Sequence, residues 1–270
     1  MSELGCHRTL YSSYMDDNNP TDSILPRHLF HYTSMSVLLN IVKNLKDGNF
    51  TFWASSLDYM NDGAEYMESR NLCEDITEEV IMDHFLGAPF ALCFSEREDN
   101  IPMWHMYANR GRGVCLDFDF AKLSNYFEIM KKKDCRTTKF DKCKYHPIED
   151  KKMAMMDENY NNESIESTGL RNTMVDSSFV KPTTFEHERE WRLMIWESQI
   201  SYPNRNIKFR ERNEAICPYV EVIIPANNLM NIIVGPCADS DSVESIRLLL
   251  GHSFEKNTIQ VVKSDLTLKI

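Results

Sequence analysis

The chain has 270 residues, of which 42% are hydrophobic and 11% aromatic, a composition typical of a folded protein with a sizeable core. Its formal net charge of −11 argues against a general nucleic-acid coat protein, because the average field repels phosphate. No apolar run approaches the roughly 20 residues of a membrane helix, and the polar, acidic beginning resembles neither a signal peptide nor a transit peptide. We therefore expect a cytoplasmic protein with no membrane partner.

Residues 1–26 lack hydrophobic periodicity and are predicted to form a flexible N-terminal arm, while 27–270 are predicted to form a single domain. The domain should begin with a strand over "HLFHY" and a helix over "SMSVLLNIVKNLK", with Thr33 or Ser34 as its N-cap. A strand over "NFTFWA" follows. A polar helix is expected from about residue 64 to 85.

In the middle of the chain, "FALCFS" and "VCLDFDF" are predicted to be strands. "IPMWHMYA" is expected to be a short helix with Pro102 in its first turn, and residues 120–133 a longer helix. "TKFDKCKY" is expected to be an edge strand. Residues 148–180, the least hydrophobic part, are predicted to be an inserted helix and mobile loop.

The C-terminal part is rich in strand-like segments and has one expected helix at residues 240–250. The segments are "EWRLMIW", "NIKF", "YVEVIIP", "MNIIVG" and "TIQVV". This order favours an α+β fold, with mixed or antiparallel β-sheets flanked by helices, over regular βαβ winding.

The eight cysteines do not form a metal motif. Cys93 and Cys115 lie in apolar strand-like runs, where small buried thiols are expected. Even the closest pair, Cys135 and Cys143, lacks the two-residue spacing of a zinc knuckle. We expect no metal.

The first candidate site is the consecutive trio His31, Tyr32 and Thr33, between a strand and a helix. In a purely structural interpretation, Thr33 caps the helix and the two rings pack beneath it. Mixed folds also present polar groups to ligands where a strand ends and a helix begins. Both interpretations remain open.

The second candidate is Asn61, Asp62 and Glu65, for which a turn followed by a capping box is the ordinary interpretation. The two carboxylates could also hold a sugar hydroxyl or a cation. In a third, Trp104 and Tyr107 share one helix face, and packing is the expected role of Trp104.

Ser95, Glu96 and Arg112 have no obvious role in a core and are better placed for a ligand. The fourth candidate is the alternating run of Glu186, Glu188 and Glu190, for which a solvated surface is the ordinary interpretation. Glu190 begins a strand whose period of two places it on the same face as Arg192. The other face carries Trp191, Leu193 and Ile195.

Seven short motifs in order resemble the bacterial domain-of-unknown-function family numbered 2971, from about residue 29 to 264. They are "HYTS", "SSLDYMND", "CFSE", "MWHMYA", "RGVCLDFD", "EREWRL" and "MNIIVG". More distantly, a first strand with His-Tyr-Thr and a late strand opened by glutamate are similar to the ADP-ribosyltransferase superfamily. This second resemblance implies an ADP-ribosyltransferase-like fold that uses NAD as its substrate.

By that resemblance, His31 would hold the nicotinamide ribose, Tyr32 or Thr33 would line the nicotinamide pocket, and Glu190 would be catalytic with Glu188 in support. A buried carboxylate suits this chemistry, because glycosidic cleavage passes through an oxocarbenium-like state.

Arginine forks suit phosphate oxygens, so Arg192 or Arg112 would pair with the diphosphate. Trp104 or Tyr107 would stack on a ring, and Ser95 would also contact the cofactor. Asn61, Asp62 and Glu65 would support the site.

The resemblance thus implies NAD-dependent ADP-ribosyl transfer in a bacterial toxin or phage-defence setting. The acceptor stays open among protein, nucleic acid, small molecule and water. One alternative is a catalytically silent module that senses a nucleotide-type ligand or binds a partner. The other is a metal-dependent nuclease or phosphodiesterase that uses Asp117, Asp119 and the glutamate run.

Overall fold

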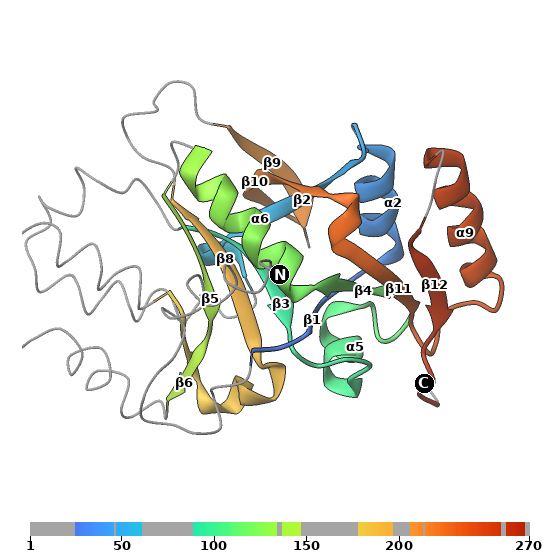
Figure 1. Cartoon of the computed structure of the whole chain (residues 1–270). Helices are drawn as coiled ribbons and strands as arrows, with labels where there is room; N and C mark the ends of the chain where they lie inside the picture. The colour runs from blue at the N-terminus through green and yellow to red at the C-terminus, as the bar shows by residue number, and fades with distance from the viewer. Residues whose placement is uncertain are drawn as a thin grey trace, which may run out of the picture.

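The computed structural model of the protein is shown in Figure 1. It describes residues 25–45, 47–60, 89–133, 137–146, 178–196, 206–212, 214–254 and 258–267. Three predictions fall almost entirely outside these ranges: the N-terminal arm, the polar helix at 64–85 and the insertion at 148–180.

The fold is α+β, as predicted, and is built on a mixed, mostly antiparallel sheet flanked by helices. The main path of the sheet runs β12-β11-β4-β1-β3-β2-β10-β9, and β8 pairs with both β3 and β5. Only β11 and β12 pair in parallel within this sheet, as far as the described residues show. The strands are β1 (His28–Thr33), β2 (Asn49–Ser56), β3 (Phe90–Ser95), β4 (Val114–Asp119), β5 (Thr137–Lys142), β8 (Glu190–Trp196), β9 (Ile207–Arg212), β10 (Ala215–Pro225), β11 (Leu229–Val234) and β12 (Gln260–Lys263). A separate parallel pair is formed by β6 (Lys144–His146) and β7 (Val180–Pro182).

The larger core lies between the sheet and three helices, α2 (Met35–Lys43), α6 (Phe120–Lys133) and α9 (Ser242–Ser253). Figure 1 shows α2 and α9 next to each other, and residues of the two helices are in contact. A smaller core lies under α5 (Ile101–Tyr107), where Tyr32 packs edge-on against Trp104. Because side chains alternate along a strand, Leu29 lies in the larger core while Tyr32 lies in the smaller one.

Two local predictions at helix starts are confirmed, whereas "TKFDKCKY", predicted as one edge strand, is divided between β5 and β6. Ser34, rather than Thr33, caps α2, since its hydroxyl accepts a hydrogen bond from the Val37 N–H at 3.3 Å. Pro102 lies in the first turn of α5, where the missing N–H costs nothing.

β3 has one strand neighbour along one edge and two along the other. On one edge β8 pairs with it from Phe90 to Ser95. On the other edge β1 pairs only at Ser95, and β2 pairs only at Phe90 and Ala91. β1 and β2 therefore diverge between these points, and in the described part of the chain no strand covers that edge of residues 92–94. This divergence positions the site.

Five cysteines fall within the described ranges, and no disulfide joins any two of them: Cys93, Cys115, Cys143, Cys217 and Cys237. None of the described helices has the length and apolar character needed to cross a membrane.

Candidate functional site

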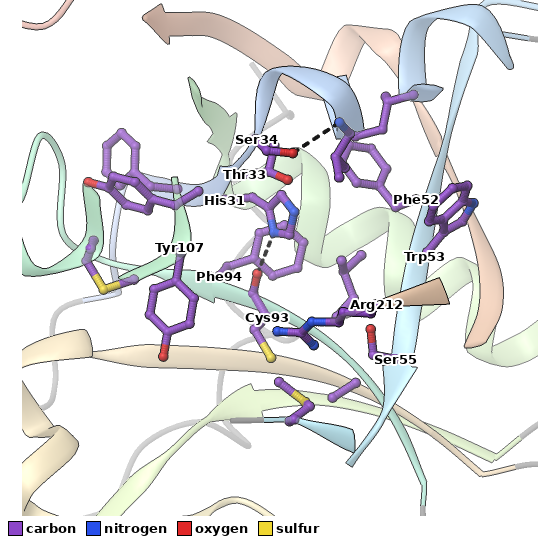
Figure 2. A pocket seen from close by; sticks show the side chains of 18 of the residues that line it. His31, Thr33, Ser34, Phe52, Trp53, Ser55, Cys93, Phe94, Tyr107 and Arg212 are labelled. Atoms are coloured by element: carbon purple, nitrogen blue, oxygen red, sulfur yellow. Dashed lines mark hydrogen bonds between the residues drawn. The ribbon is translucent and has the colours of Figure 1, made fainter. Parts of the chain in front are cut away.

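A cavity of about 560 Å³ opens where β1 and β2 diverge from β3. Its walls come from β1, α2, β2, β3, α5 and β9, and from β7, β8 and the segment that joins them. Figure 2 shows Tyr107 on one side of the cavity and Trp53, Ser55 and Arg212 on the other, with His31 between them. Elements far apart in the sequence thus form one site.

His31 lies at the centre of this cavity and is held in one tautomer. Its Nδ1 lies 2.8 Å from the carbonyl oxygen of Cys93, and because a carbonyl only accepts, Nδ1 carries the proton. Burial lowers the pKa of His31; the Cys93 bond opposes this shift, and the charge of Arg210 adds to it. The ring is therefore neutral at pH 7. Nε2 is then a hydrogen-bond acceptor, and none of the described residues is bonded to it.

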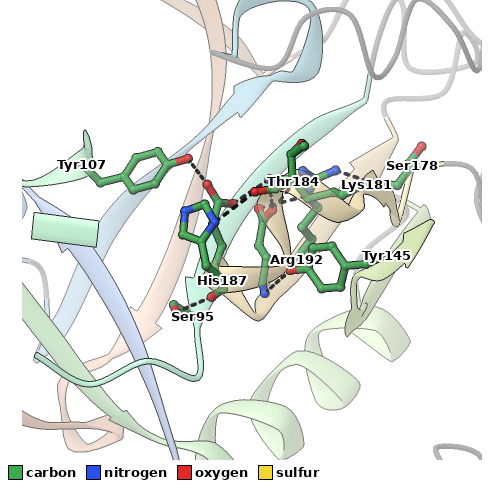
Figure 3. Close-up of polar contacts among 10 residues, drawn as sticks. Ser95, Tyr107, Tyr145, Ser178, Lys181, Thr184, His187 and Arg192 are labelled. Carbon is green, nitrogen blue, oxygen red and sulfur yellow. Dashed lines mark hydrogen bonds and ion pairs between the residues drawn. The ribbon is translucent and has the colours of Figure 1, made fainter. Parts of the chain in front are cut away.

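Two buried carboxylates share one buried ammonium at the edge of the cavity. Lys181 Nζ lies 2.6 Å from Glu188 Oε2 and 2.8 Å from Glu190 Oε2. All three side chains line the cavity. Figure 3 shows Lys181 close to Arg192 and Tyr145 in the same polar network.

Arg192, which lies outside the cavity lining, forms an ion pair with Glu190. Its Nε lies 2.9 Å from Oε1 of Glu190 and its Nη2 3.0 Å from Oε2, while Nη1 donates to the Ser178 carbonyl. Burial raises the pKa of Glu190, but the Arg192 and Lys181 charges outweigh burial and hold that pKa below its usual value. Glu190 is ionised, and the formal charges of Lys181, Arg192, Glu188 and Glu190 sum to zero.

Tyr107 completes the network from α5. Its hydroxyl donates to Glu188 Oε1 at 2.6 Å. Burial, followed by the charge of Glu188, raises the pKa of Tyr107, so the phenol keeps its proton and can continue to donate it.

The β9 side of the cavity carries two arginines, Arg210 and Arg212, and one carboxylate, Glu211, whose Oε1 accepts a hydrogen bond from the Glu214 N–H. Arg210 Nη2 donates to Ser55 Oγ at 2.7 Å, and its guanidinium lies over the rings of Trp53 and Tyr219, 5.2 and 5.7 Å from their centroids. In Figure 2, Arg212 is also directed into the cavity.

Six of the residues singled out in the sequence line the cavity together: His31, Tyr32, Thr33, Tyr107, Glu188 and Glu190. Other described candidates lie outside its lining: Ser95, Trp104, Arg112, Arg192, and Glu186, whose side chain is exposed. Asn61, Asp62 and Glu65 lie outside the described residues.

The residues outside the lining have structural contacts of their own. Ser95 Oγ donates to the Glu188 carbonyl, which ties the end of β3 to the segment before β8. Trp104 is fully buried and its Nε1 donates to Asp99 at 2.7 Å, in line with the packing role expected for it. Arg112 is exposed in the turn after α5.

The carboxylates of the nuclease alternative are engaged elsewhere. Asp117 is hydrogen-bonded by His28 at 2.7 Å and by Asn231 at 2.6 Å, while Asp119 accepts from the Lys122 N–H in α6. Among the described residues, no cluster of three or more His, Cys, Asp or Glu is arranged to hold a metal ion. The described geometry therefore offers no support for metal-dependent hydrolysis.

Lys181, Arg210 and Arg212 were not anticipated from the sequence. The segment "IKFRER" carried a usable signal, because its period of two places Lys208, Arg210 and Arg212 on one face of a strand. Lys181 in "VKP" carried none, since only the tertiary fold brings it between two glutamates.

Comparison with known proteins gives one match. Residues 103–193 match the model of a family described as a protein of unknown function, DUF2971. The chain is similar to DUF2971 over that segment. No curated protein and no solved structure matches the chain significantly.

The DUF2971 segment is shorter than the stretch from about 29 to 264 over which the motifs resemble the family. It contains Tyr107, Lys181, Glu188, Glu190 and Arg192, and so the whole carboxylate network. The His31 and β9 sides of the cavity lie outside the segment.

Proposed function

We propose that the cavity binds a nucleotide of the NAD type and that the protein is an NAD-dependent ADP-ribosyltransferase-like enzyme. The observation that carries the proposal is that His31 and Glu190 line the same cavity. These are the residues to which the superfamily resemblance assigns ribose binding and catalysis.

The size and lining of the cavity support a ligand of this class. Small-molecule sites measure roughly 300–1,000 Å³ and combine apolar walls with a few oriented polar groups. Here about 560 Å³ is enclosed by rings such as Phe52 and Trp53, with His31 and the carboxylates as the polar groups. A dinucleotide would find aromatic surface for its rings and hydrogen-bonding groups for its sugars.

His31 is suited to bind a sugar hydroxyl. Its neutral ring, with the proton on Nδ1, offers Nε2 as an acceptor inside the cavity. A ribose hydroxyl can donate to that nitrogen without any change in protonation.

The proposed reaction breaks the bond between the ribose carbon and the nicotinamide nitrogen, and both electrons leave with nicotinamide. The positive charge that develops on the sugar would be stabilised by the Glu190 carboxylate. The acceptor then forms a bond to the same carbon and releases its proton to solvent, because both oxygens of Glu188 already accept hydrogen bonds, from Tyr107 and Lys181.

A second candidate function is a catalytically silent sensor that keeps the pocket. The observation that favours it is the engagement of both oxygens of Glu190 by Arg192 and Lys181. A carboxylate neutralised in this way stabilises a neighbouring cation less than an unpaired one does.

The experiment measures two quantities on the same samples: the shift in melting temperature with millimolar NAD, and nicotinamide release in the presence of a bacterial lysate. Wild type is compared with Glu190→Gln, with His31→Ala, and with Glu244→Gln on the exposed face of α9 as a matched charge control. We expect NAD to stabilise wild type and Glu244→Gln, and His31→Ala much less.

Nicotinamide release should fall by about 100-fold in Glu190→Gln. Binding without release in any variant would favour the sensor. No shift in wild type, with the fold intact by circular dichroism, would remove NAD from the proposal.

A further inference from the structure

We propose that Arg210, with Arg212 beside it, forms an oxyanion subsite that binds the phosphate groups of the ligand at the β9 side of the cavity. The inference rests on the proposed function only in assigning the anion to a nucleotide. The cationic subsite itself follows from the described geometry.

Arg210 is a partly buried cation with incomplete hydrogen bonding. Among the described residues, its buried Nε has no hydrogen-bond partner, and the one hydrogen bond that its side chain makes there runs from Nη2 to Ser55. Within the described ranges no carboxylate forms an ion pair with it. Since a buried guanidinium is costly without a counter-charge, an anion bound in the cavity would offset that cost.

The surroundings of Arg210 add to the free-energy cost of its charge. Burial, followed by the nearby charge of Arg212, lowers the pKa of Arg210. The neighbouring ring of His31 is neutral and supplies no negative charge. A phosphate placed between the two arginines would offset the cost of burying the Arg210 charge and its repulsion from Arg212.

The guanidinium is held in place before any ligand arrives. The rings of Trp53 and Tyr219 lie against it, and Ser55 Oγ fixes one nitrogen. A planar fork held in this way has lost much of its side-chain freedom, so less entropy is lost when it binds a phosphate.

The two arginines are also arranged to act together. A period of two places Arg210 and Arg212 on the same face of β9, and both line the cavity. Figure 2 shows Arg212 directed inward on the side of Ser55, away from Tyr107. Tyr107 is hydrogen-bonded to Glu188, so the carboxylates lie on the side of the cavity opposite Arg212. A ligand would therefore place its phosphates at β9 and its reacting sugar near the carboxylates.

The test is calorimetric titration of the full chain with inorganic pyrophosphate and with ADP-ribose. Arg210→Gln is compared with Lys208→Gln, which removes the same charge from the same face of β9 but outside the cavity, where Lys208 pairs with Glu221. We expect Arg210→Gln to bind both probes at least about tenfold more weakly, and Lys208→Gln to match wild type. Arg210→Lys should fall between them, because it keeps the charge and loses the fork.

Equal affinity of wild type and Arg210→Gln for both probes overturns the inference, even if NAD binds, and leaves the proposed function standing. Pyrophosphate binding that Arg210→Gln loses, in a chain that binds no NAD, supports the subsite and overturns the nucleotide assignment. Failure of wild type to bind either probe overturns the inference. Circular dichroism of each variant checks the fold, and Arg210→Lys replaces Arg210→Gln if the latter does not fold.

Discussion

The imidazole of His31 donates its Nδ1 proton to the carbonyl oxygen of Cys93, 2.8 Å away, in the gap where β1 and β2 separate. A side chain thus provides the hydrogen bond that a neighbouring strand would otherwise make to this part of β3. The bond also fixes the tautomer, so that Nε2 is left as the acceptor in the cavity. One contact therefore supports both the fold and the proposed binding chemistry.

The pKa of His31 leads to a prediction about pH. Because it lies below the unfolded value of about 6.5, the unfolded chain binds more protons as the pH falls through that value. Wild type should therefore lose more unfolding free energy than His31→Gln between pH 8 and pH 5.5. Glu190 affects the pH dependence of stability only at lower pH, because the stability that its ionised form contributes is lost as the pH falls below its unfolded pKa of about 4.5.

Urea denaturation followed by tryptophan fluorescence at the two pH values measures the difference. His252→Gln, on the exposed side of α9, is the control and should behave as wild type. An equal loss of stability in wild type and His31→Gln would show that His31 is not the group responsible.

Replacing Lys181 by methionine should strongly destabilise the protein. The substitution leaves Glu188 and Glu190 without the ammonium that they share, and breaking a buried ion pair from one side costs about 3–5 kcal/mol. Chemical denaturation at pH 7.5 measures the loss. Lys208→Met removes the exposed pair with Glu221 and should cost less than about 1 kcal/mol. Similar values for the two variants would contradict a structural role for the buried network.

Tyr32→Phe tests whether that tyrosine has a role in the fold. Its hydroxyl donates to the Arg97 carbonyl at 2.7 Å and accepts from the Asn100 N–H at 3.1 Å, next to the start of α5. Removing it should lower the unfolding free energy by about 1–3 kcal/mol. Tyr59→Phe, at an exposed ring, should change it by only a few tenths. A neutral Tyr32→Phe would mean that water replaces the lost contacts.

Two glycine substitutions should change the unfolding free energy in opposite directions. A methyl group at Gly113 would overlap the Thr33 carbonyl oxygen and lie 2.9 Å from that of Ala108, so Gly113→Ala should cost at least about 1–3 kcal/mol. Gly251 lies in α9 with open space around it, and Gly251→Ala should stabilise the protein by roughly 0.5–1 kcal/mol. Melting temperatures of both variants test the pair, and a drop in Gly251→Ala would be inconsistent with it.

Local features were predictable from the sequence because they depend on neighbouring residues. The spacing of Leu38, Ile41 and Val42 encodes one buried face of α2. The alternation along β8 correctly placed Glu190 and Arg192 on one face and the core residues on the other: Trp191, Leu193 and Ile195 all lie in the larger core. The α+β class followed from the order of such segments.

What Glu190 and Arg192 contact was decided only in three dimensions. A shared strand face is compatible with two groups that bind a ligand or with two that bind each other. Burial of β8 between β3 and β5 favours the ion pair. Lys181 reaches Glu188 and Glu190 because a short 3-10 helix, Thr183–Glu188, folds the chain back between β7 and β8.

The cavity itself depends on strand order. β1, β3 and β8 lie far apart along the chain, and no local pattern indicates that β1 and β2 diverge along one edge of β3. The sequence by itself determined the elements and proposed His31 and Glu190 as candidates. Only the tertiary structure determined that they line one cavity and that Arg210 lines it with them, because sheet pairing is a property of the whole chain.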